Sequence, residues 1–220
     1  MLKNRILIAL GCLFAATLTS EAQISRYSSG GGGFSGGSGG GSGDMIAGAG
    51  YLMSMEEAVV DEAKEIGFFG YAGKQMGDKA FWYVQGVSKS ASYDIFGTEM
   101  SNSEMSFSGV FNYNVVGSNS ENFSVYGFAG AGMSMLTQEI TYAQAPDSDI
   151  KVESEAIILP MGAGVNFAPF SGVKVFAEYD MTYYMAHDVA LGGGMGGQAA
   201  TVEAAGANVG SLKLGVQIGL

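Results

Sequence analysis

Apolar and polar residues alternate along several segments of the chain, most clearly over residues 173–186. Every second position there is apolar or aromatic: Val173, Val175, Ala177, Tyr179, Met181, Tyr183 and Met185. The positions between them include Lys174, Glu178 and Asp180. Successive side chains of a β-strand point to opposite faces, so this pattern predicts a strand with one apolar face and one charged face.

The same two-residue period recurs at 104–115, 153–167 and 208–220. The first three apolar-rich runs alternate less cleanly, because Gln85 and Lys89 fall on the same face as Phe81 and Tyr83. Together the runs predict eight strands, at residues 44–54, 66–76, 80–96, 104–115, 123–138, 153–167, 173–186 and 208–220.

The breaks between these runs alternate in length, as in an up-and-down barrel with short turns at one end and longer loops at the other. The short breaks are 77–79, 117–122 and 168–172, and the longer ones are 55–65, 97–103, 139–152 and 187–207. Within the first long break, Ser54 and Glu57 have the spacing of a helix capping box, which predicts a short helix there.

Alternation alone does not say which face points inward, and a soluble lipocalin-like barrel has its apolar face inside. Two features favour an apolar exterior. The polar face combines small and charged residues, which suits a narrow lumen filled by hydrogen bonds and ion pairs: Gly162, Gly164, Asn166 and Lys213. Aromatic residues also gather near strand ends, as in the girdles of membrane proteins: Phe81, Trp82, Tyr83, Phe167, Phe170, Tyr179, Tyr183 and Tyr184.

The strands also have the right length for a membrane. Eleven residues at about 3.3 Å each, tilted by about 45°, span roughly 25 Å, the height of the apolar band of such barrels. We therefore predict an all-β fold, an eight-stranded antiparallel up-and-down transmembrane β-barrel over residues 44–220.

The N-terminus has the features of a secretory signal peptide over residues 1–22. Lys3 and Arg5 precede an apolar run at 6–18, and small residues flank a cleavage position after Ala22. Lipoprotein processing at Cys12, the only cysteine, is the alternative. Residues 23–43 are rich in Gly and Ser and bury almost no apolar surface, so we expect a disordered segment there rather than a phosphate-binding loop.

The chain of 220 residues has a formal net charge of −11. An acidic protein disfavours nucleic acid, because that affinity comes mainly from basic residues at phosphates. The same charge disfavours polybasic docking on anionic lipid. Neither a cofactor nor a metal is indicated by any motif.

Several stretches resemble the OmpA/OmpX-type outer-membrane β-barrel superfamily. They are F-S-V-Y-G-F-A-G-A-G at 123–132, I-L-P-M-G-A-G-V-N-F-A-P at 158–169, V-K-V-F-A-E-Y-D at 173–180 and the last strand. The resemblance implies the outer membrane of a Gram-negative-type bacterium, with outer-membrane lipid, the barrel assembly machinery and periplasmic chaperones as partners.

The last eight residues resemble the β-signal that this assembly machinery recognises. Lys213, Gly215, Ile218 and Leu220 fit its polar, glycine and apolar positions, although Ile218 and Leu220 stand where aromatic residues are usual.

Charged residues on the inner face are the first candidate site. Lys174, Glu178 and Asp180 share this face with Lys213 of the next strand. An ion or proton path is one interpretation. We favour an ion-pair network that fills the lumen, because eight strands leave room for little besides side chains.

His187, the only histidine, lies beside Asp188, and some eight-stranded barrels are lipid A-modifying enzymes. A histidine-activated nucleophile needs a serine in reach, and no serine spacing predicts one, since nothing in the sequence brings Ser134 or Ser154 to His187. We therefore predict no catalytic residue. The acidic residues Asp147, Asp149, Glu153 and Glu155 lack a calcium-loop spacing and are expected to be solvated.

The sequence thus predicts a non-enzymatic barrel with a structural, envelope-integrity or surface-interaction role. A narrow pore for small solutes and a lipid A-modifying enzyme are the alternatives.

Overall fold

In the computed structural model, the described part of the chain comprises residues 45–55, 66–95, 98–142, 150–170, 172–193 and 200–219. The predicted signal peptide, the Gly/Ser-rich segment and the helix predicted after Ser54 lie outside these residues. The described residues form ten strands: β1 (Met45–Ser54), β2 (Ile66–Met76), β3 (Ala80–Ile95), β4 (Thr98–Val116), β5 (Phe123–Tyr142), β6 (Ile150–Phe170), β7 (Val173–Tyr184), β8 (His187–Gly193), β9 (Ala200–Ala204) and β10 (Ala207–Gly219).

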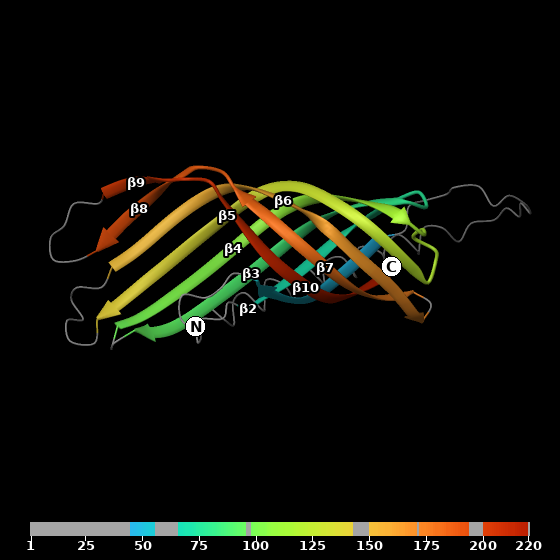
Figure 1. Ribbon diagram of the computed structural model, residues 1–220, viewed down its shortest axis with the longest axis horizontal. Coiled ribbons are helices and arrows are strands. Elements are labelled where there is room, and N and C mark those ends of the chain that lie inside the picture. Colours follow the sequence, from blue (N-terminus) through green and yellow to red (C-terminus); the bar gives the residue numbers. More distant parts are fainter. Residues whose placement is uncertain are drawn as a thin grey trace, which may run out of the picture. The chain divides into compact units, whose positions relative to one another are not determined.

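Eight of these strands close into a ring (Figure 1). β1 to β7 pair in chain order, β7 pairs with β10, and β10 pairs with β1, always antiparallel. The predicted fold class and strand count are therefore confirmed. Among the described residues, no helix is long and apolar enough to cross a membrane.

The two remaining strands continue this wall. β8 follows β7 after two residues and pairs with residues 150–154 of β6, and β9 pairs with β8. Both lie at the end of the barrel away from the label of the C-terminus in Figure 1. Together, β8 and β9 extend the β7–β10 hairpin beyond the closed ring.

The predicted long breaks at 97–103, 139–152 and 187–207 are therefore wrong in part. Residues 98–103 belong to β4, 139–142 to β5 and 150–152 to β6, while 187–207 contains β8 and β9. These segments are short and carry few large apolar residues, so the apolar face of each is too brief to mark a membrane-spanning strand. The backbone ladder forms without it, since water can solvate both faces.

The short breaks contain turns, as predicted, although residues 168–170 of the third belong to β6. Each contains a glycine with positive φ, a conformation that residues with a side chain rarely adopt: Gly77, Gly117 and Gly172.

The outer surface of the ring is apolar. On β4, β6, β7 and β10, the apolar positions predicted to face lipid point outward, and their large exposed members are Phe107, Phe111, Tyr113, Val115, Ile157, Met161, Val165, Phe167, Val175, Tyr179, Met181, Tyr183, Leu214 and Val216. From Met105 to Val115 on β4, this band spans eleven residues, or roughly 25 Å of membrane at the usual tilt.

The lumen contains a layer of aromatic rings, which we call the aromatic layer: Phe69, Tyr71, Phe81, Tyr83, Tyr126, Phe128 and Phe176. The predicted girdle at 81–83 is therefore wrong for two of its three residues. Trp82 is 42% exposed on the outer surface, whereas Tyr83 is 1% exposed and lies inside. This also explains the poor alternation of the early strands, because their luminal face carries aromatic rings as well as polar residues.

Glycines across the backbone ladder make room for these rings. Tyr126 and Phe128 on β5 lie opposite Gly164 and Gly162 on β6. Phe69, Tyr71, Tyr83 and Phe176 likewise lie opposite a glycine of a neighbouring strand. A Cβ atom at Gly164 would come within 2.6 Å of the Tyr126 ring. Each ring thus occupies space that a facing side chain would otherwise fill.

Gly164→Ala is expected to lower the free energy of unfolding by about 1–3 kcal/mol, the usual cost of an overpacked core. Denaturant titration of the folded barrel in lipid vesicles measures this. Gly109→Ala is the matched control, because nothing lies within 4 Å of a Cβ there. Equal effects of the two substitutions would contradict the packing argument.

Candidate functional site

The lumen of the ring is the candidate site, because it holds the buried charges of the described chain. Two lysines and three acids are buried there: Lys89, Lys213, Glu104, Glu178 and Asp180. They form two groups, and the first lies against the aromatic layer.

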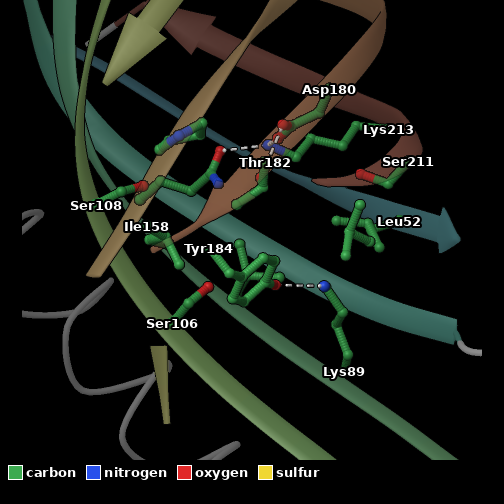
Figure 2. Close-up of a pocket in the computed structure, with 14 residues that line it drawn as sticks. Leu52, Lys89, Ser106, Ser108, Ile158, Asp180, Thr182, Tyr184, Ser211 and Lys213 are labelled. Atoms are coloured by element: carbon green, nitrogen blue, oxygen red, sulfur yellow. Dashed lines mark hydrogen bonds and ion pairs between the residues drawn. The ribbon is translucent and has the colours of Figure 1, made fainter. Parts of the chain in front are cut away.

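Lys213 is the centre of the first group and is 1% exposed. It forms an ion pair with Asp180 of the adjacent β7, and its Nζ donates a hydrogen bond to Gln85 Oε1 (3.2 Å). Figure 2 shows Lys213 and Asp180 pointing toward each other. The ammonium also lies 5.7 Å from the ring centres of both Phe69 and Phe128. A buried ammonium is thus compensated by a carboxylate, an amide oxygen and two aromatic faces.

Glu178 lies directly across the ladder from Lys213, yet Asp180 takes the ion pair. Glu178 Oε1 instead accepts a hydrogen bond from the hydroxyl of Tyr126 (2.8 Å). The two buried lysines face three buried acids, so the described lumen holds one carboxyl group more than it holds ammonium groups. Glu178 is the carboxyl group without an ion pair in the described structure.

The second group lies nearer the end with the longer breaks. Lys89 Nζ forms an ion pair with Glu104 Oε2 (2.9 Å). Ser134 and Tyr184 both donate hydrogen bonds to Glu104 Oε1, at 2.7 and 2.6 Å. Lys89 also donates to the Tyr184 hydroxyl (3.3 Å), as Figure 2 shows. Both carboxylate oxygens are therefore satisfied, as a buried charge requires.

This second group was not predicted from the sequence. Lys89 and Glu104 are directly opposite each other on β3 and β4. The predicted loop at 97–103 hid that register, because it separated the two strands by too many residues. If a tight turn had been predicted between β3 and β4, with both strands of equal length, Lys89 would have been placed opposite Glu104.

Lys174, the fourth residue of the predicted network, lies apart from the others. It is near the short turns, where its Nζ donates to the backbone carbonyl of Asn119 (2.7 Å). The structure therefore brings Asp180 and Lys213 together with Glu178 beside them, and places Lys174 elsewhere.

Little space remains between the two charged groups. A cavity of about 20 Å³ lies there, lined by residues that include Gln85, Ser108, Asp180 and Tyr184. This volume holds about one water molecule. The aromatic layer adjoins it on the side of the short turns.

The residues of the predicted β-signal lie on the last strand. Lys213 takes part in the ion pair with Asp180, and a Cβ atom at Gly215 would come within 2.6 Å of the Phe176 ring. Ile218 pairs with Ala47 and Val173 in the two neighbouring ladders, and Leu220 lies outside the described residues. Recognition by the assembly machinery stays a prediction.

No catalytic grouping is present in the described part of the chain. His187 Nδ1 lies 2.8 Å from the carbonyl oxygen of Met185 in its own segment. Ser134 and Ser154 are buried on the luminal face, and Ser134 is bonded to Glu104. Within those residues, no three His, Cys, Asp or Glu side chains are grouped to hold a metal ion.

The chain shares its fold with solved bacterial outer-membrane proteins. A major outer membrane protein from Thermus thermophilus matches with a TM-score of 0.54 at 10% identity, over 80% of this chain and 99% of that one. OprG from Pseudomonas aeruginosa matches with a TM-score of 0.52 at 12% identity, over 81% of this chain and 96% of that one. No protein-family model and no curated protein sequence matches.

The chain is an eight-stranded barrel of the outer-membrane type. Its apolar exterior needs lipid around it, and a closed barrel satisfies every backbone group of the spanning strands without water. The expected location in an outer membrane agrees with this fold. Identities this low establish the fold alone, and function has to be argued from the lumen and the surface.

Asp180→Asn is expected to destabilise the barrel by about 3–5 kcal/mol, because it leaves the buried Lys213 ammonium without its ion pair. Glu178→Gln keeps an acceptor for Tyr126 and removes the surplus carboxyl group, so its effect should be within about 1 kcal/mol of zero. Denaturant titration compares the two variants. If Glu178→Gln were the more damaging, the assignment of the ion pair to Asp180 would be wrong.

Proposed function

We propose that this protein is a non-enzymatic outer-membrane barrel that acts as a structural element of the envelope and carries a surface-exposed sheet. One observation carries the proposal: the lumen is filled. Seven aromatic side chains and five charged ones occupy it, and the cavity between the charged groups has room for about one water molecule.

The filling is also tightly connected, which argues against a narrow pore. The rings of Tyr71 and Tyr83 are 4.5 Å apart, those of Phe81 and Tyr83 5.9 Å, and those of Phe69 and Phe176 5.8 Å. Each ring lies within the distance of a favourable aromatic contact. A solute would have to displace several of these rings at once.

Planar-bilayer recordings test this directly. The wild-type barrel is expected to give no steady open channel. The double variant Tyr71→Ala, Tyr83→Ala removes two adjacent rings and should raise the conductance, which shows that the assay detects an opened lumen. Tyr113→Ala, on the outer surface, is the matched control and should behave as the wild type. Steady channels in the wild-type protein would favour the pore.

Nothing in the described geometry supports a lipid A-modifying enzyme. Such a hydrolase needs a nucleophile and a base within hydrogen-bond reach. The hydrogen bond recorded for His187 is to a backbone carbonyl of its own segment, and the two candidate serines face the lumen.

A surface role is favoured by the strands that continue past the apolar band. In the described sheet β9 is the last strand, so its outer edge has no neighbouring strand. Asp188 of β8 lies directly opposite Glu203 of β9. Two like charges in this position destabilise a sheet. Lys151 of β6 binds Glu153 (2.5 Å), which raises the pKa of this ammonium.

The structural role and the surface role can be tested separately by returning variants of the protein to a strain that lacks it. A chain in which residues 187–204 are replaced by a short Gly-Ser turn keeps all eight ring strands, so it should fold and shift its gel mobility on heating like the wild type. It is expected to restore resistance to detergent but not adhesion of the cells to surfaces. Full restoration of adhesion would contradict a surface role for β8 and β9.

A further inference from the structure

A cavity of about 450 Å³ lies at the end of the barrel with the short turns. We call it the turn-end pocket. Its walls come from the β4–β5 turn, the β6–β7 turn and the ends of β2 and β10: Gln75, Asn119, Ser120, Glu121, Asn122, Ala168, Phe170, Gly172, Lys174, Gln217 and Gly219. This volume is within the usual range of small-molecule sites, about 300–1,000 Å³.

The pocket is closed at its inner end. Gln217 is 5% exposed, and its Oε1 accepts a hydrogen bond from the hydroxyl of Tyr71 (3.0 Å). Tyr71 belongs to the aromatic layer, which fills the lumen beyond. The pocket is therefore a site with a floor rather than the mouth of a channel.

Its rim is held in place by Asn119. The Asn119 side chain donates to the carbonyls of Gly77 and Ala80 (2.9 and 3.2 Å) and accepts from Asn114 Nδ2 (2.7 Å). These bonds tie the β4–β5 turn to the β2–β3 turn. A rim fixed before binding loses little conformational freedom when a ligand arrives.

The chemistry of the lining selects the ligand. Lys174 is the only cation among the residues that line the pocket, and one of its three N–H groups is used by the Asn119 carbonyl. Glu121 is the only acidic residue of the lining, and it is exposed on the turn. Among the described residues, no carboxylate forms an ion pair with it. Gln75, Asn122 and Gln217 add amide groups, and the ring of Phe170, 73% exposed, adds an apolar contact.

We propose that the turn-end pocket binds a small carboxylate-bearing peptide, with its carboxylate on Lys174 and its amides on the surrounding Gln and Asn side chains. The short turns of outer-membrane barrels face the periplasm, so the ligand belongs to that compartment. This site is separate from the filled lumen and from the surface sheet.

Nuclear magnetic resonance of the full-length barrel in detergent micelles tests the proposal, with N-acetylglutamate as the probe. We expect saturable shifts of the backbone amides of Gly172, Lys174 and Gly219. Lys174→Gln should weaken binding by about tenfold or more, the effect of losing a charge-assisted hydrogen bond. Lys174→Arg should retain binding, because it keeps the cation.

Two controls separate the pocket from general charge and from misfolding. Lys79→Gln removes an exposed lysine of the β2–β3 turn that does not line the pocket, and it should bind as the wild type does. The gel shift on heating shows that each variant is folded. Equal shifts with N-acetylglutamine amide, unchanged binding by a folded Lys174→Gln variant, or no saturable shift in the wild type would each overturn the proposal.

Discussion

The contact between aromatic rings and facing glycines inside the ring is the constraint on which the rest of the structure depends. An eight-stranded barrel has a lumen just wide enough for side chains. Seven buried rings fit there, and six of them lie directly opposite a glycine of a neighbouring strand. The apolar core of this protein is thus a layer within the lumen, while the larger apolar surface faces outward.

This layer also sets the environment of the buried charges. Lys213 is 1% exposed, and its ammonium lies 5.7 Å from the ring centres of Phe69 and Phe128, so bulk water does not reach it. A charge in that position needs a partner, and Asp180 on the adjacent strand supplies it. The second pair, Lys89 and Glu104, follows the same rule with Ser134 and Tyr184 as additional donors. The lumen contains aromatic rings on one side and ion pairs on the other, and these contacts join the strands across the barrel.

The proposed functions lie at the two ends because the middle is occupied. At one end, β8 and β9 carry the sheet past the apolar band and offer an acidic surface. At the other, the short turns surround the turn-end pocket, with the Lys174 ammonium at its wall. Only loops and strand ends are free to vary when the wall and the lumen are fixed by packing.

The sequence by itself determined the strands and their faces, because a two-residue period reports directly on which side of a strand a residue lies. It placed Glu178, Asp180 and Lys213 in the lumen and the apolar residues of β4, β6, β7 and β10 in lipid. It did not place Phe81 and Tyr83, since a luminal face that carries both aromatic and polar residues shows no clear two-residue period. Only the tertiary structure decided that Asp180 rather than Glu178 pairs with Lys213, that Lys89 meets Glu104 and that Lys174 lies at the turns. Those choices depend on strand register and on closure of the ring, which join residues far apart in the chain and leave no local pattern in the sequence.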